Sequence, residues 1–219
     1  MLTLRAGFNL KKLELPPIYP ITDKAIARKP THLSILTEVV RGGAQLVQIR
    51  DKSTPIEELL PDLRKCVEFA QKKGVTLILN DRCDLVRSIG AMGVHLGQED
   101  LPPMEARMLL GKEAIIGIST HSLRQVRQSA DWPIQYIGVG PVFGTSTKQN
   151  TAPTVGLRGL AQACRLSAVP VVAIGGIGIE QVRSVLSSGA ASIAVISALM
   201  GAKDLARQMH RFLEKARET

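Results

Sequence analysis

Residues 77–100, LILNDRCDLVRSIGAMGVHLGQED, hold two short apolar runs that each end in polar and acidic side chains. The runs at 75–79 and 92–96 have the length and the polar ends that are typical of buried strands in a parallel sheet. Asp81 follows the first run and Asp100 follows the second. Because the carboxyl ends of parallel strands lie on one face, we expect both acids to point at one pocket.

The two acids suggest a metal site. Mg²⁺ is held in proteins by one or two carboxylates and leaves its other positions to water and substrate phosphate, so Asp81 and Asp100 suit it. The alternative is that each Asp caps the helix that follows it, which is the commonest role of Asp where a strand leads into a helix. This stretch alone leaves both interpretations open.

Strand and helix signals alternate along the whole chain. Strands are expected at 18–22, 46–50, 75–79, 92–96, 115–119, 136–139, 169–174 and 193–196. Helices are expected at 31–42, after Thr54 and Pro55, and at 104–110, 123–130, 157–166, 179–188 and 199–216. In the second helix we expect Thr54 at the N-cap and Pro55 at the first helical position.

Eight strand–helix units in about 200 residues favour the α/β class and a closed (β/α)8 TIM barrel that folds as a single domain. An open doubly wound sheet is the alternative. We expect residues 1–16 to form an N-terminal leader and residues 17–219 to form the barrel catalytic domain. No GxGxxG follows the first strand and no GxxxxGK[ST] occurs, so the dinucleotide and P-loop fingerprints are missing.

Composition narrows the possible partners. Lys and Arg exceed Asp and Glu by 28 to 19, giving a net charge of +9. The basic residues are spread along the chain and few aromatic residues accompany them, so anionic small substrates explain the charge as well as nucleic acid does. Three cysteines without CxxC spacing argue against disulfides or zinc and favour a cytoplasmic location. No apolar run approaches the roughly 18 residues of a membrane span.

Basic and small residues follow several strands. Period-two alternation places Gln48, Arg50 and Lys52 on one side, and a planar guanidinium beside an ammonium suits a pyrophosphate. Two ordinary surface ion pairs are the alternative. The segment Gly144-Thr145-Ser146-Thr147-Lys148 combines hydroxyls, a small residue and a cation, as phosphate-binding loops do, although alone it would pass for a surface loop.

Small residues also follow the last two expected strands. Gly175-Gly176 and Ile196-Ser197-Ala198 occupy the positions where many barrels bind a phosphate through backbone N–H groups. We expect His95 and Cys83 to be structural. The sequence leaves open whether His121 is a cap or a site residue.

Eight segments, QIRDK, LNDRCDL, GVHLGQEDLP, IGISTHS, YIGVGPVFGTSTK, VGL, VVAIGGI and VISA, resemble the thiamine-phosphate synthase family. They occur in order between about residue 18 and residue 198. The resemblance implies a (β/α)8 barrel that joins 4-amino-2-methyl-5-hydroxymethylpyrimidine diphosphate to a thiazole phosphate. The products it implies are thiamine phosphate and pyrophosphate, and the cofactor is Mg²⁺.

The resemblance also implies roles for individual residues. Asp81 and Asp100 match the metal ligands. The pyrimidine diphosphate contacts match Gln48, Ile49, Arg50, Asp51, Lys52, Asn80, Ser119 and Lys148, and the thiazole phosphate contacts match Thr145, Ser146, Thr147, Gly176, Ile196 and Ser197. The catalytic residues would be Arg50, Lys52, Lys148 and Ser119. Where the family often reads Gln-Tyr-Arg-Glu-Lys this chain has Ile49 and Asp51, which alternation turns away from the expected site.

The residue types suit this chemistry. A benzylic-type carbon that carries a diphosphate ionises when Mg²⁺ and cations neutralise the leaving oxygens, and no protein nucleophile is required. The alternatives are a thiazole tautomerase relative on the same barrel, which needs neither the metal acids nor the diphosphate cations, and a basic nucleic-acid-binding module. We expect small-molecule substrates, no nucleic acid and no membrane partner, and leave a homo-oligomer open.

Overall fold

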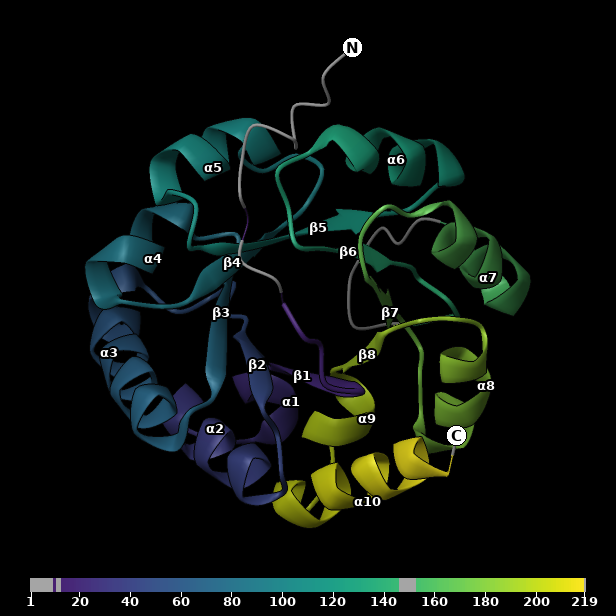
Figure 1. The fold of residues 1–219 in the computed structure, drawn as a ribbon. Helices are drawn as coiled ribbons and strands as arrows, with labels where there is room; N and C mark the ends of the chain where they lie inside the picture. Colours follow the sequence, from purple (N-terminus) through teal and green to yellow (C-terminus); the bar gives the residue numbers. More distant parts are fainter. Residues whose placement is uncertain (1–9, 11–12, 146–152, 219) are drawn as a thin grey trace.

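The computed structural model describes residue 10 and residues 13–145 and 153–218. Eight parallel strands close into a barrel in chain order, and the helices form a ring around it (Figure 1). The strands are β1 (Ile18–Thr22), β2 (Leu46–Ile49), β3 (Thr76–Asn80), β4 (Gly93–Leu96), β5 (Ile115–Thr120), β6 (Tyr136–Val139), β7 (Val171–Ile174) and β8 (Ser192–Val195). The expected barrel is therefore confirmed.

Closure of the sheet depends on the pairing of its first and last strands. Ile18 of β1 lies opposite Ile193 of β8, and the pairing is parallel like that of every other neighbouring pair. A doubly wound sheet is open and does not pair its strands in one closed ring, so that alternative is wrong. The closed ring brings the carboxyl ends of all eight strands to one face.

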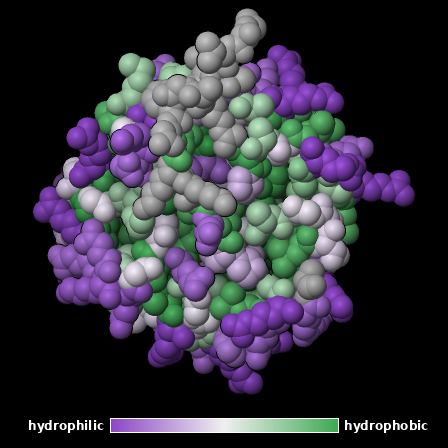
Figure 2. All heavy atoms as spheres, in the orientation of Figure 1, coloured by the Kyte–Doolittle hydropathy of each residue, from purple (hydrophilic) through white to green (hydrophobic). Residues whose placement is uncertain are grey.

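Helices cover the outer surface of the sheet. They are α1 (Lys24–Ala27), α2 (His32–Arg41), α3 (Ile56–Lys73), α4 (Cys83–Ile89), α5 (Pro103–Leu110), α6 (Leu123–Gln128), α7 (Gly156–Leu166), α8 (Val182–Ser187), α9 (Ser197–Met200) and α10 (Leu205–Arg217), with 3-10 turns at Ser129–Asp131 and Ile179–Gln181. Figure 2 shows hydrophilic residues around the edge of the face drawn, over this ring. No helix in the described ranges is both long enough and apolar enough to cross a membrane.

Two local expectations about helices are wrong. The N-cap of α3 is Pro55, not Thr54, and the Thr54 hydroxyl instead donates to Asp51 at 2.8 Å and accepts from Lys24 at 2.7 Å. The single helix expected at 199–216 is two helices. The chain leaves α9 at Gly201 and begins α10 after Asp204, whose carboxylate accepts a hydrogen bond from the backbone N of Arg207.

The core has two parts, one on each side of the sheet. The larger lies between the strands and the helices, where Ile35, Leu63 and Phe212 are fully or almost fully buried. A smaller cluster fills the inside of the barrel and consists of Tyr19, Ile21, Leu46, Ile78, Ile115, Tyr136, Val172 and Ala194. The inside of the barrel is therefore packed with side chains.

Candidate active site

A cavity of about 940 Å³ opens where the strands end. Its lining comes from every strand of the barrel and includes Tyr19, Ile21, Gln48, Arg50, Lys52, Asn80, Asp81, His95, Gly97, Gln98, Glu99, Asp100, Ser119, His121, Tyr136, Gly138, Gly140, Pro141, Thr145, Val172, Ile174, Gly175, Gly176, Ile177, Ala194, Ile196 and Ser197. Such a volume holds one or two small molecules.

Asp81 and Asp100 meet at one rim of this cavity. Asp81 follows β3 with a left-handed backbone (φ 63°), which Asp tolerates better than most residues, and its N–H donates to the carbonyl of His95 at 2.8 Å. The Asp100 carboxylate accepts from the N–H of Gly97 at 2.6 Å. Burial, together with the neighbouring Asp81 carboxylate, raises the pKa of Asp100 above its ordinary value.

Neither acid caps a helix. The helix after Asp81 has Arg82 at its N-cap and the helix after Asp100 has Pro102, and neither helix start has a side-chain capping bond. The capping alternative is therefore wrong for both. Across the described ranges no group of three or more His, Cys, Asp or Glu side chains is arranged to hold a metal. Two hard carboxylates are still a fitting donor set for Mg²⁺, which needs only one or two.

Two cations, Arg50 and Lys52, follow β2, and Lys52 lies beside one of these acids. Lys52 forms an ion pair with Asp81 Oδ2, and Arg50 Nη1 lies 3.4 Å from Asp23 Oδ2. Each cation thus has an acidic partner, as the simpler interpretation expects. Both also line the cavity, together with Gln48, so the alternation along β2 predicted the facing side correctly.

Ile49 and Asp51 face the other way. Ile49 is 3% exposed and belongs to the core between the sheet and the helices. The Asp51 carboxylate is bonded to His32, Lys24 and the backbone N–H groups of the following turn. Neither lines the cavity, so their side chains are not placed to bind a substrate there, and the physical reason is the two-residue period of the strand.

A chain of aromatic and polar groups forms the floor. Tyr19 and Tyr136 share a hydrogen bond of 3.0 Å between their hydroxyls, and Tyr136 continues to His95 Nδ1 at 3.0 Å. His95 Nε2 then lies 2.9 Å from Ser119 Oγ. Burial raises the pKa of Tyr136 far above its ordinary value, so this hydroxyl remains a hydrogen-bond donor. From the sequence we expected His95 to be only a structural residue, but it also lines the cavity.

The opposite side of the ring carries glycines. In the barrel order β7 stands four strands away from β3, so Gly175 and Gly176 face the acids across the cavity. A Cβ on Gly176 would lie 2.4 Å from the carbonyl oxygen of Gly144, and the backbone there is left-handed at φ 66°. Glycine therefore brings two backbone segments together at this wall. Thr145, Ile196 and Ser197 line the same cavity.

Three residues expected at the site, Ser146, Thr147 and Lys148, lie outside the described residues. His121 Nδ1 donates to the carbonyl of Gly140 at 2.7 Å, which leaves Nε2 as the acceptor when the ring is neutral. Burial raises the pKa of the Cys83 thiol to about 11, and this residue does not line the cavity, as expected of a structural cysteine.

Fold and site together define the chain as a (β/α)8-barrel enzyme with its charged cavity at the carboxyl ends of the strands. The family model described as thiamine monophosphate synthase matches residues 18–199. The chain therefore belongs to the thiamine monophosphate synthase family, which makes it a transferase.

Individual relatives agree with this assignment. A thiamine-phosphate synthase of Albidiferax ferrireducens is 41% identical over 202 residues, which cover 92% of this chain and 91% of the relative. One from Azorhizobium caulinodans is 39% identical and is covered to 96%. The solved thiamine phosphate pyrophosphorylase from Pyrococcus furiosus superposes with a TM-score of 0.84 at 32% identity, covering 92% of this chain and 96% of that one.

Proposed function

We propose that this thiamine-phosphate synthase joins 4-amino-2-methyl-5-hydroxymethylpyrimidine diphosphate to a thiazole phosphate and releases pyrophosphate. The observation that carries the proposal is the division of one cavity into two sides. Paired acids and cations stand at the exits of β2 to β4, and glycines and hydroxyls stand at the exits of β7 and β8. Two anionic substrates bound on these two sides would meet over the floor between them.

Asp81 and Asp100 are the residues that would hold Mg²⁺. When bound, the ion supplies positive charge to the oxygens of the leaving diphosphate. Lys52 forms an ion pair with Asp81 and lines the same rim, so it would also contact a diphosphate bound there. Arg50 adds a planar fork of donors that fits two phosphate oxygens at once.

Bond breaking in the pyrimidine substrate would be driven by electrostatic stabilisation. The C–O bond breaks and its electron pair leaves with the diphosphate, while the electron-rich aminopyrimidine bears the positive charge. Arg50 and Lys52 stabilise the departing oxygens more in the transition state than in the ground state, since negative charge grows there as the bond breaks. Lys148 is proposed to act on the same oxygens. The thiazole nitrogen then donates its lone pair to the carbon, so no protein nucleophile takes part.

The floor would orient the pyrimidine ring. Gln48 and Ser119 present an amide and a hydroxyl group to the cavity, and these groups match the ring nitrogens and the exocyclic amine. His95, whose two ring nitrogens bond to Tyr136 and Ser119, would fix the Ser119 hydroxyl. The thiazole phosphate would lie against Gly176, Ile196 and Ser197, which line the cavity and would offer it backbone N–H groups. We also propose a cytoplasmic enzyme, which is supported by the unpaired thiols of Cys66, Cys83 and Cys164.

The test is synthesis from purified components. The protein is incubated with both substrates and Mg²⁺, and thiamine phosphate and pyrophosphate are quantified by chromatography and by a coupled assay. We expect the two products in equal amounts, and none when either substrate is omitted. Thiamine phosphate formation with full turnover in excess chelator would contradict the metal assignment. Failure to form it with both substrates and Mg²⁺ would contradict the proposed reaction.

A further inference from the structure

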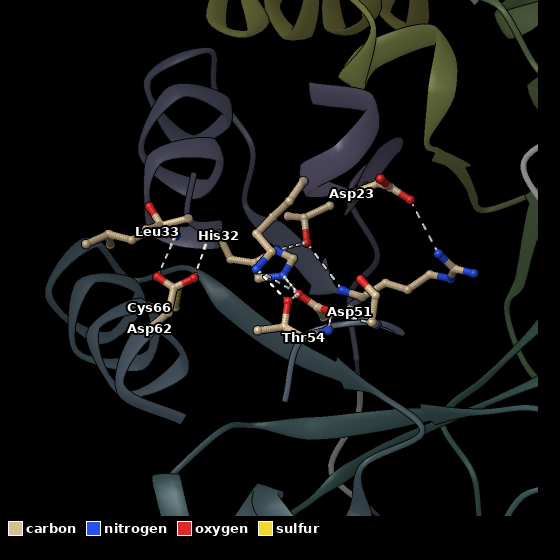
Figure 3. A network of polar contacts seen from close by, with 12 residues as sticks. Asp23, His32, Leu33, Asp51, Thr54, Asp62 and Cys66 are labelled. Atoms are coloured by element: carbon tan, nitrogen blue, oxygen red, sulfur yellow. Dashed lines mark hydrogen bonds and ion pairs between the residues drawn. The ribbon is translucent and has the colours of Figure 1, made fainter. Parts of the chain in front are cut away.

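His32 lies behind the β2 exit, outside the cavity, and is fully buried at the start of α2 (Figure 3). Its Nε2 is 2.9 Å from Asp51 Oδ2 and its Nδ1 is 2.8 Å from Thr22 Oγ1. The carboxylate of Asp62 accepts from the backbone N–H of His32 at 2.6 Å and holds the helix start in place. The ring is thus fixed at both of its nitrogens, and the residue is also held at its backbone N–H.

The direction of these hydrogen bonds follows from Asp51, because an ionised carboxylate can only accept. In a neutral ring His32 Nε2 therefore carries the hydrogen that is donated to Asp51, and Nδ1 accepts from the Thr22 hydroxyl. Thr22 Oγ1 in turn accepts from the N–H of Arg50 at 3.3 Å. Burial lowers the pKa of His32 in spite of the neighbouring Asp51, which is consistent with a neutral ring. The charged groups that face it are Asp51, Asp62 and Lys24.

The Asp51 carboxylate also accepts hydrogen bonds from the turn that follows it. It accepts from the backbone N–H of Ser53 at 3.0 Å and of Thr54 at 2.8 Å, and from the Thr54 hydroxyl at 2.8 Å. Lys24 Nζ lies 3.1 Å from Asp51 Oδ2 and balances its charge. The backbone is therefore held on both sides of Lys52, at Arg50 through Thr22 and at residues 53 and 54 through Asp51.

We propose that His32 and Asp51 are positioning residues that hold Arg50 and Lys52 at the cavity rim. Neither lines the cavity, yet the backbone segment that they help to hold, residues 50–54, carries both cations that line it. Side chains that orient a binding group from behind commonly change affinity or rate by about 10- to 100-fold when they are removed. A displacement of about 1 Å in a reacting group has a similar effect. The inference rests on the proposed function, because it concerns the pyrimidine diphosphate.

The test compares three variants of the full chain. Thr22→Val keeps the shape of the side chain but removes the hydroxyl between Arg50 and His32, and Thr22→Ser restores it. His32→Asn removes the imidazole. We expect Thr22→Val and His32→Asn to lower kcat/KM for the pyrimidine diphosphate about 10- to 100-fold, with KM for the thiazole phosphate nearly unchanged, and Thr22→Ser to recover most of the loss.

Arg107→Met is the control for lost stability. Arg107 is buried and bonds to the carbonyls of Pro133 and Ala114 at the amino end of the barrel, far from the β2 exit. A purely structural role for the His32 network predicts that this control loses activity in the same pattern. The inference is overturned if the folded Thr22→Val protein keeps wild-type kcat/KM, or if the KM values for both substrates rise together.

Binding of inorganic pyrophosphate with Mg²⁺, measured by calorimetry, separates this inference from the proposed function. Wild-type protein that makes no thiamine phosphate would contradict the function, whatever the variants do. Wild-type protein that binds pyrophosphate about tenfold more tightly than Thr22→Val would support the positioning role without any turnover. Equal pyrophosphate affinity in Thr22→Val, Thr22→Ser and wild type would overturn it.

Discussion

Residues at the rim of the cavity contribute either a charged side chain or a particular backbone conformation. Asp81 does both, because its carboxylate faces the cavity while its own backbone is left-handed at φ 63°. Left-handed backbone in a residue other than glycine costs about 1–3 kcal/mol and persists where the surroundings impose it. The strain at Asp81 thus coincides with the position proposed for a metal ligand.

Replacement of either acid by its amide tests the metal site. We expect Asp81→Asn and Asp100→Asn to lower kcat strongly and to raise the Mg²⁺ concentration needed for half-maximal activity, because a neutral amide is a weaker ligand than a carboxylate. Folding should survive in Asp81→Asn, since Asn also tolerates a left-handed backbone. Activity is measured across a Mg²⁺ titration, and the free energy of unfolding by urea denaturation. An unchanged Mg²⁺ requirement in both variants would count against the assignment.

His32 gives the stability a pH dependence. Burial lowers its pKa in the folded protein below the unfolded value of about 6.5, so the unfolded chain binds the proton more readily. The free energy of unfolding therefore gains from this residue above about pH 6.5 and loses that gain as the pH falls towards the folded pKa. Urea unfolding near pH 7.5 and pH 5.5 should show a smaller drop in His32→Asn than in wild type. The other histidines are present in both proteins, so an equal drop would contradict the prediction.

Part of the site could be predicted residue by residue and part could not. Alternation along β2 identified Gln48, Arg50 and Lys52 as facing the cavity, because strand geometry is local. The hydrogen bond between Tyr19 and Tyr136 joins residues 117 positions apart, so no local sequence pattern predicts it. His95 lies between two apolar neighbours and reads as a buried side chain, although the same alternation turns it inward. Its partner Tyr136 is what makes it part of the floor.

At the scale of elements, β5 shows how one missing side chain makes room for the floor. A Cβ on Gly117 would lie 2.0 Å from Cζ of Tyr136, so the ring can occupy the barrel only because the residue is glycine. The Tyr136 hydroxyl reaches His95 from that position. Glycine in the middle of a strand normally weakens it, and here it brings an aromatic ring close to the strand.

Gly117→Ala should therefore affect both folding and catalysis. We expect a loss of about 1–3 kcal/mol in the free energy of unfolding from overpacking, and a fall in kcat as Tyr136 moves away from His95. Gly159→Ala in α7 is the comparison, because its new Cβ would lie 3.2 Å from Cβ of Val155, the N-cap residue of that helix. Denaturant unfolding and steady-state kinetics measure both effects. A Gly117→Ala protein with wild-type kcat would show that the floor does not need this position of the ring.

Element boundaries were predicted well wherever one apolar pattern governed them. The strands deviate by two residues at most, for instance in β7, which was expected from residue 169 and begins at Val171. The break between α9 and α10 was missed because the apolar pattern continues across it. There Asp204 caps a new helix, and a capping side chain between two apolar stretches is easily overlooked.

At the scale of the whole molecule, the net charge of +9 should speed the capture of anionic substrates. Salt screens such attraction over a distance of about 8 Å at physiological ionic strength. We expect kcat/KM for the pyrimidine diphosphate to fall several-fold as NaCl rises from about 50 to about 500 mM, with a much smaller change in kcat. Initial rates at several salt concentrations measure this, with a neutral viscogen as the control for diffusion. Parallel falls in kcat and kcat/KM would instead point to an effect on the bound state.

The pairing of β1 with β8 has a consequence for how the protein is made. Ile18 is translated long before Ile193, yet they are neighbours in the finished sheet. Until β8 arrives, the nascent chain holds at most an open sheet with two unpaired edges, and open edges invite pairing with other chains. The last contact also spans most of the sequence, and such distant contacts slow folding. The growing chain is thus exposed to aggregation until β8 has been translated and closes the sheet.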